Sequence, residues 1–341
     1  MQAPRPLRLS AAILAGLAIG AIAVPASASA SASASATTIL FVGNSFTYGE
    51  PAGAAPIVQN YKPGTVTDLN GSGIGGVPAL FKAMTVAAGL DYTVSLETIP
   101  GVGLDTHYNT KLDTILGPYD KVVLQSYSTL DAAKPGDPAT LIKYSGLLAQ
   151  AFHEANPDVD ILLDATWSRA DLTYRTTTSP WYGKPIDQMA LDVRSGYDAA
   201  DAASSLIDGV IPVGQAWNRA IADGLADDNP YDGIGEGQIN LWAPDNYHAS
   251  QYGYYLEALT MFGSVTGLDP RSLGAGDSIA AELGIGAAEA DALQRYAADQ
   301  LATEEVPEPG MAAMFLTLGG LMCVARRRKS RKAAGPAKSA V

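Results

Sequence analysis

Five short runs of apolar and β-branched residues recur along the middle of the chain, separated by amphipathic segments. Each run predicts a buried strand, because it is short and ends at glycine, proline or a polar residue. The expected strands cover residues 38–42, 92–99, 121–125, 159–163 and 209–213. The expected helices cover residues 79–90, 112–116, 138–156, 189–207, 214–225 and 249–266. This alternation favours an α/β fold, a three-layer sandwich with a mainly parallel central sheet.

The two ends of the chain differ in charge from the rest of it. Residues 1–36 and 309–341 hold nine of the 22 basic residues and none of the 35 acidic ones. The body between them therefore has 13 basic and 35 acidic residues, a net charge of −22. Nucleic-acid binding depends on Lys and Arg at the phosphates, so this acidic body predicts no nucleic-acid partner. The body also lacks cysteine, because Cys323 lies in the C-terminal end, and this excludes a cysteine nucleophile.

Residues 1–36 have the pattern of a secretory signal. Arg5 and Arg8 precede an apolar stretch from Leu9 to Val24, and Ala-Ser alternation continues to Ala36. A retained membrane anchor is the alternative, but the apolar run is short for a span of about 20 residues. We therefore expect export and cleavage by signal peptidase.

Residues 306–341 form a second distinctive end. Val306-Pro307-Glu308-Pro309-Gly310 is followed by an apolar run over 311–325 and the basic cluster 326–329. This order resembles the PEP-CTERM sorting signal of exported bacterial proteins. The resemblance implies a short transmembrane segment, transient insertion in the inner membrane and cleavage by an exosortase, with an ordinary tail anchor as the alternative. In either case we expect the body outside the cytoplasm, at the cell surface or extracellular.

The body is expected to be one domain. Residues 37–282 contain no repeat or linker, and about 250 residues is a plausible size for a single domain of this fold class. The Ala- and Glu-rich residues 283–305 predict one more helix or a stalk.

Polar residues follow the expected strands at their carboxyl ends, where open parallel sheets bind ligands. Ser45 follows the first strand and can supply a hydroxyl nucleophile. His248 can act as its base, and Asp245 is close enough in sequence to orient the imidazole. Gly101 and Gln125 follow the next two strands and can offer a backbone N–H and a side-chain amide to an oxyanion.

Two segments carry a family resemblance. Phe41-Val42-Gly43-Asn44-Ser45-Phe46-Thr47, together with Asp245-Asn246-Tyr247-His248, resembles the SGNH (GDSL-like) hydrolase superfamily. The resemblance spans most of residues 38–265. It implies a flavodoxin-like fold, ester hydrolysis without a cofactor, and Ser45, His248 and Asp245 as nucleophile, base and orienting acid.

The same resemblance implies an oxyanion hole built from the N–H groups of Ser45 and Gly101 and a third side chain. Two positions depart from the usual pattern. Asn44 stands where the family usually has Asp, and Gln125 stands where it usually has Asn. A Gln offers the same amide one methylene further out, so Gln125 is the expected third donor.

Loops near the strand ends supply further candidates. Substrate contacts are predicted at four residues, with structural packing as the alternative role: His107, Trp167, Arg169 and Trp242. Asp227, Asp228 and Asp232 lack the spacing of a calcium-binding loop, so no metal site is expected.

The leading hypothesis is an exported serine esterase acting on small acyl esters, with an acetyl group on an extracellular polysaccharide as the favoured example. A lipase or thioesterase acting on long acyl chains is one alternative. A non-catalytic surface protein that binds glycans is another. The net charge of the body favours a neutral substrate, unless Arg169, Arg175 or Arg194 forms a local positive patch.

Overall fold

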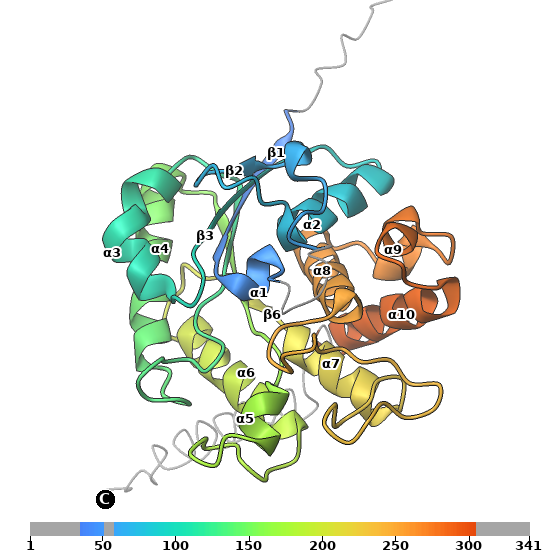
Figure 1. The fold of residues 1–341 in the computed structure, drawn as a ribbon. Helices are drawn as coiled ribbons and strands as arrows, with labels where there is room; N and C mark the ends of the chain where they lie inside the picture. Colours follow the sequence, from blue (N-terminus) through green and yellow to red (C-terminus); the bar gives the residue numbers. More distant parts are fainter. Residues whose placement is uncertain (1–34, 51–57, 305–341) are drawn as a thin grey trace, which may run out of the picture. The chain divides into compact units, whose positions relative to one another are not determined.

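The strands of the chain form a six-stranded sheet in the computed structural model, which describes residues 35–50 and 58–304 (Figure 1). All neighbouring strands are parallel, in the order β2-β3-β1-β4-β5-β6. The strands are β1 (Thr37–Gly43), β2 (Thr67–Asp68), β3 (Tyr92–Thr98), β4 (Lys121–Leu124), β5 (Asp160–Asp164) and β6 (Gly209–Ile211). The predicted α/β fold with a parallel central sheet is confirmed.

Helices connect most of these strands. They are α1 (Ser45–Tyr48), α2 (Gly76–Ala87), α3 (Leu104–Ile115), α4 (Ala139–Ala155), α5 (Ala170–Tyr174), α6 (Asp187–Ala202), α7 (Val213–Ala222), α8 (Gln251–Thr266), α9 (Ser278–Glu282) and α10 (Ala287–Glu304). Two short 3-10 helices, η1 (Pro63–Thr65) and η2 (Pro270–Leu273), complete the described elements.

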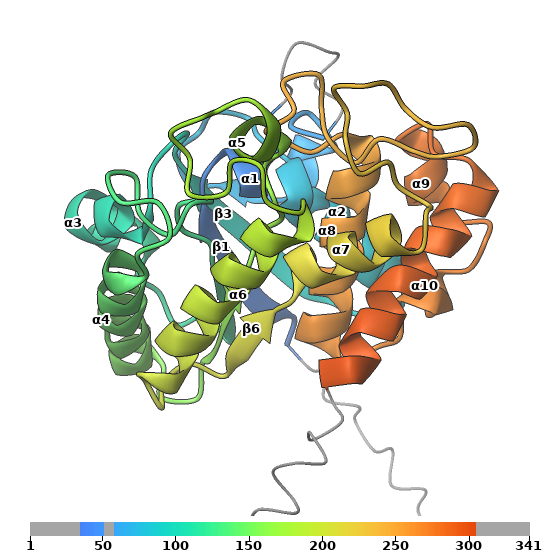
Figure 2. The ribbon, with the colours of Figure 1, turned by 90° about the horizontal axis from the view of Figure 1, so that it is seen from below.

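The sheet separates two apolar cores, because successive side chains of a strand point to opposite faces. Ile39 and Phe41 of β1 belong to the core that also contains buried residues of α2, α7, α8 and α10. Leu40 and Val42 belong to the other core, beneath α3, α4 and α6. Figure 1 shows α3 and α4 on one side of the sheet and α2 and α8 on the other. Figure 2 shows α6, α7 and α10 in a row.

The structure corrects the bounds of one expected helix and decides between the two alternatives for the segment that follows residue 282. The helix expected at residues 112–116 begins at Leu104. Its start could not be predicted, because Leu104, His107 and Ile115 are its only buried residues and the polar residues between them hide the helical periodicity. Of the two alternatives for residues 283–305, a helix or a stalk, most of the described residues of the segment form a helix. Its helix α10 buries Leu293, Tyr296 and Ala297 in the core shared with α7 and α8.

Both predicted targeting signals lie largely or wholly outside the described residues. Within residues 35–50 and 58–304, no helix is long and apolar enough to cross a membrane. The signal peptide and the sorting signal therefore stay predictions.

Candidate active site

Ser45 lies at the point where β1 ends and α1 begins. Asn44 caps this short helix, with its side-chain oxygen accepting from the Phe46 N–H at 3.1 Å. Gly43 must be glycine here, because a Cβ atom would overlap the side chains of Thr47 and Gln125. The turn places Ser45 at the carboxyl edge of the sheet, as the motif predicts.

The Gln125 side chain is part of this turn rather than of the cleft. Its Oε1 accepts from the Asn44 N–H at 2.9 Å and from the Thr47 hydroxyl at 3.1 Å. Its Nε2 donates to the Ser126 carbonyl, and the residue is buried. The expectation that Gln125 supplies the third oxyanion donor therefore needs correction, because this amide holds β4 to the start of α1.

The Asn44 side chain continues the same network. Its Nδ2 donates to the carbonyl oxygens of Val102 at 2.8 Å and Ser126 at 3.0 Å. A carboxylate could not make these two bonds, because it has no hydrogen to donate. The two departures from the family pattern, Asn44 and Gln125, thus belong to one buried hydrogen-bond network.

Two backbone N–H groups are free to face an oxyanion. Ser45 is the first residue of α1, and an N–H at this position has no partner within the helix. Gly101 has φ +70°, a left-handed conformation that favours glycine. Among the described residues, neither N–H group has a hydrogen-bond acceptor.

His248 and Asp245 form a close pair in the turn before α8. His248 Nδ1 lies 2.6 Å from Asp245 Oδ2, and Asp245 Oδ1 accepts from the N–H groups of Tyr247 and His248. Burial opposes ionisation of Asp245, but these hydrogen bonds outweigh it and lower the pKa of the carboxyl. The turn itself requires Asn246 at φ +55°, a conformation that Asn tolerates.

The other ring nitrogen of His248 has no hydrogen-bond partner among the described residues. His248 is 6% exposed, and its ring centroid lies 5.6 Å from that of Phe46, the neighbour of Ser45. The structure therefore brings the Ser45 turn and the His248–Asp245 pair to one place. No hydrogen bond between Ser45 Oγ and His248 Nε2 is present in the described part of the chain.

Trp167 and Trp242 pack behind the His248 turn. Both indoles are almost fully buried, and Trp167 stacks on Trp217 with 4.6 Å between ring centroids. Trp167 Nε1 donates to the Tyr247 carbonyl at 3.3 Å, and Trp242 Nε1 donates to the Ser168 carbonyl at 2.9 Å. The prediction that they contact substrate is wrong, because both side chains are buried in the apolar core.

His107 is also buried rather than in the cleft. Its Nδ1 lies 2.5 Å from Glu97 Oε2, and both side chains are fully covered. Burial opposes ionisation of Glu97, but hydrogen bonds from His107 and Asn70 lower the pKa of its carboxyl. His107 therefore takes the structural role, and the predicted substrate contact is wrong.

Arg169 does line a cavity, with its side chain 17% exposed. Its guanidinium sits 3.6 Å from the Tyr247 ring centroid and pairs with Asp171, whose Oδ2 is 2.7 Å from Nη2. Arg169 and Tyr247 line a cavity of about 330 Å³ together with Asn44 and Gly101. The cavity has many hydroxyl groups, from Tyr127, Ser128, Thr129, Thr176, Thr178 and Ser179.

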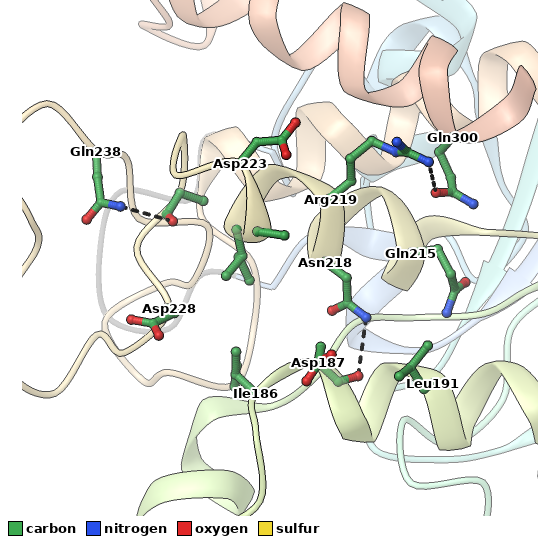
Figure 3. Close-up of a pocket in the computed structure, with 13 residues that line it drawn as sticks. Ile186, Asp187, Leu191, Gln215, Asn218, Arg219, Asp223, Asp228, Gln238 and Gln300 are labelled. Atoms are coloured by element: carbon green, nitrogen blue, oxygen red, sulfur yellow. Dashed lines mark hydrogen bonds between the residues drawn. The ribbon is translucent and has the colours of Figure 1, made fainter. Parts of the chain in front are cut away.

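A larger cavity of about 790 Å³ lies elsewhere, between α6, α7 and α10 (Figure 3). Asn218 donates to the Asp187 carbonyl across it, and Arg219 donates to Gln300. None of the predicted site residues lines it. Its size alone therefore does not identify it as the reactive cleft.

The acidic loop that contains Asp227, Asp228 and Asp232 is stabilised by hydrogen bonds within the loop. Asp227 accepts from the N–H groups of Asn229 and Gly235, each at 2.8 Å. Among the described residues, no group of three or more His, Cys, Asp or Glu side chains is arranged to hold a metal ion.

Sequence reasoning missed Glu50, which lies beside His248. Its Oε2 is 3.7 Å from His248 Nε2. Glu50 comes three residues after Thr47, the last residue of the motif. The direction in which its side chain points depends on the left-handed turn at Gly49, with φ +76°. Only the presence of a glycine at that point hints at such a turn.

No family model and no curated protein matches the chain. Several solved structures resemble it at low identity. TesA is 14% identical, with a TM-score of 0.42 over 68% of this chain and 99% of that one. An alpha/beta hydrolase enzyme from the metagenome of Lake Arreo, Spain, is 14% identical, with a TM-score of 0.45 over 68% and 95%. An acetyl xylan esterase from Geobacillus stearothermophilus is 15% identical, with a TM-score of 0.40 over 73% and 95%.

Proposed function

We propose that the chain is an exported serine ester hydrolase of the SGNH type. Ser45 Oγ attacks the ester carbonyl carbon while His248 Nε2 takes the hydroxyl proton and Asp245 holds Nδ1. His248 then gives that proton to the departing alcohol oxygen. Water attacks the acyl-enzyme by the same route and releases the acid and Ser45.

The observation that carries this proposal is the state of the His248 ring. One nitrogen is held by the Asp245 carboxylate at 2.6 Å, and the other is buried without a hydrogen-bond partner among the described residues. A general base needs this arrangement, in which a third group fixes the ring and one nitrogen stays free for the nucleophile's proton.

The N–H groups of Ser45 and Gly101 are the proposed oxyanion donors. Both lie at the carboxyl edge of the sheet, and neither is used by the described fold. Preorganised donors of this kind stabilise the charge that develops in the transition state, with one donor contributing about 10²–10³ in rate.

The proposed substrate is a small acyl ester, favourably an acetyl group on a polysaccharide. The cavity beside Asn44 and Gly101 is modest in volume and rich in hydroxyl groups. Such a lining suits a hydroxylated group better than a long alkyl chain, because its hydroxyl groups can form hydrogen bonds with those of a bound sugar. The charges agree with a neutral substrate, because Arg194 is paired with Asp198 and Glu304.

Ester hydrolysis by residues 37–305 tests this proposal. We expect hydrolysis of p-nitrophenyl acetate, with rates that fall from acetate to butyrate to a long-chain ester. Ser45→Ala should reduce kcat by at least about 10³-fold, since the nucleophile is lost. Equal rates in both proteins would refute the esterase proposal and favour a glycan-binding role, and a preference for the long chain would favour a lipase.

Export is a separate proposal that rests on the two ends of the sequence. Signal peptidase and an exosortase would act on residues 1–36 and 306–341, and the second segment would hold the chain in the inner membrane before cleavage. Cell fractionation with and without residues 306–341 tests it, and an unchanged location would exclude a sorting role for the tail.

A further inference from the structure

Two carboxylates flank the His248 ring, one at each nitrogen. Asp245 Oδ2 lies 2.6 Å from Nδ1, and Glu50 Oε2 lies 3.7 Å from Nε2. A triad needs only the first of these. Nε2 is the atom that would take the proton from Ser45, so the second carboxylate faces the side of the ring where positive charge appears.

The position of Glu50 is fixed at several points. The Tyr48 hydroxyl donates to Glu50 Oε2 at 2.7 Å. The Glu50 N–H donates to the Ser45 carbonyl at 3.1 Å. The Tyr254 hydroxyl, which is fully buried, lies 3.3 Å from the Ser45 carbonyl and 3.4 Å from the Glu50 carbonyl. Glu50 is thus attached to the same short turn that carries Ser45.

The remaining charged and titratable groups around His248 leave Glu50 a distinct role. Asp245 binds the opposite nitrogen, and Tyr247 stacks on the ring with 4.0 Å between centroids. Arg169 lies beyond Tyr247, over its ring. Tyr48 and Tyr254 stay neutral, because burial raises the pKa of both phenols. Among these groups, Glu50 is the one that faces Nε2 with a negative charge.

We infer that Glu50 is an electrostatic partner of His248 that stabilises the imidazolium formed when Nε2 takes the Ser45 proton. This inference rests on the proposed esterase function. As Ser45 Oγ bonds to the carbonyl carbon, its proton moves to Nε2 and the ring becomes positive beside Glu50. The proton then leaves with the alcohol oxygen. Glu50 carries no proton itself and acts through charge alone.

The consequence for pH dependence follows from the sign of this charge. A carboxylate near Nε2 favours the protonated ring, so the free base becomes available only at higher pH. Removal of the charge should therefore move the acid limb of kcat/KM to lower pH. Because the Glu50 side chain is 40% exposed, solvent screening keeps this effect small.

The test compares the full-length chain with Glu50→Gln. We expect the midpoint of the acid limb to move to lower pH, and the plateau kcat to fall about two- to fivefold with KM little changed. Tyr48→Phe, which frees Glu50 from its anchor, should shift the limb in the same direction by less. Glu236→Gln, an equal charge change at an exposed position, is the control and should shift neither.

A second readout separates this inference from the esterase proposal. The titration of the His248 ring followed by NMR should have a lower midpoint in Glu50→Gln than in the parent chain, whether or not the protein hydrolyses esters. An active parent enzyme with identical acid limbs and identical NMR midpoints in both proteins would overturn the role of Glu50 alone. Absence of Ser45-dependent hydrolysis with a shifted NMR midpoint would overturn the esterase proposal instead.

Discussion

The Asn44 side chain forms hydrogen bonds with three segments that meet at the carboxyl ends of the central strands. Its side chain caps α1, and it donates to carbonyl groups in the loop after β3 and at the end of β4. The loop after β3 contains Gly101, the proposed oxyanion donor. One buried amide thus sets the distance between the nucleophile and a group expected to stabilise its transition state.

Asn44→Asp should therefore be harmful, although Asp is the usual residue at this position in the resembling family. The carboxylate would face the carbonyl oxygens of Val102 and Ser126 without a hydrogen to donate. We expect a loss of about 1–3 kcal/mol in the free energy of unfolding, measured by urea denaturation, and reduced esterase activity. Asn60→Asp, an exposed position, is the control, and equal effects of both changes would contradict this role.

Between elements, β5 and α8 meet through two buried carboxyl groups, Asp164 and Glu257. Both residues are fully buried. Burial raises the pKa of Asp164 to about 7, and burial together with the neighbouring Asp164 raises the pKa of Glu257 well above its ordinary value. The folded state thus keeps protons that the unfolded chain releases near pH 4, so the contribution of this pair to stability is greatest below that pH and is lost as pH rises through the folded-state pKa values.

Glu257→Gln should make the free energy of unfolding depend less on pH. Each such carboxyl removes up to about 1.4 kcal/mol of stability per pH unit between its unfolded and folded pKa values. Above the unfolded-state pKa of an ordinary carboxyl, the parent chain should lose stability through both Asp164 and Glu257, and the variant should lose less. Urea unfolding at pH 5 and pH 7 measures the difference, with Glu236→Gln as the charge-matched control. The same loss in all three proteins would show that Glu257 is not the group responsible.

The segment after β5 and the turn before α8 also support each other. Trp167 donates to Tyr247, Trp242 donates to Ser168, and the Asp171 N–H donates to the Asn246 carbonyl at 3.1 Å. These contacts hold the His248 turn from behind. They explain why aromatic residues near strand ends, which the sequence suggests as substrate contacts, are packed inside the protein.

At the scale of the whole molecule, the sequence predicts the order of strands and helices well. Local patterns such as residues 38–42 and 138–156 decide these elements, because alternation and helical periodicity are visible without the fold. The start of α3 could not be predicted, since few of its residues are buried. The two-residue β2 is too short to leave a pattern.

The site is predictable only in part, because local patterns in the sequence do not encode contacts between distant segments. Asp245 and His248 are three residues apart, so one turn suffices to pair them. The orientation of Gln125 depends on Asn44 and Thr47, which come from another strand and its following helix. Glu50 reaches His248 across about 200 residues of sequence, and no local pattern encodes that contact.

The central claim is that Ser45 is a nucleophile activated by His248, and covalent labelling tests it most directly. A fluorophosphonate probe should add to the folded chain with one equivalent, and peptide mass spectrometry should place the adduct on Ser45. His248→Ala should slow the labelling strongly, because the free hydroxyl is a weak nucleophile. An unlabelled parent chain, or equal labelling of Ser45→Ala, would contradict the account.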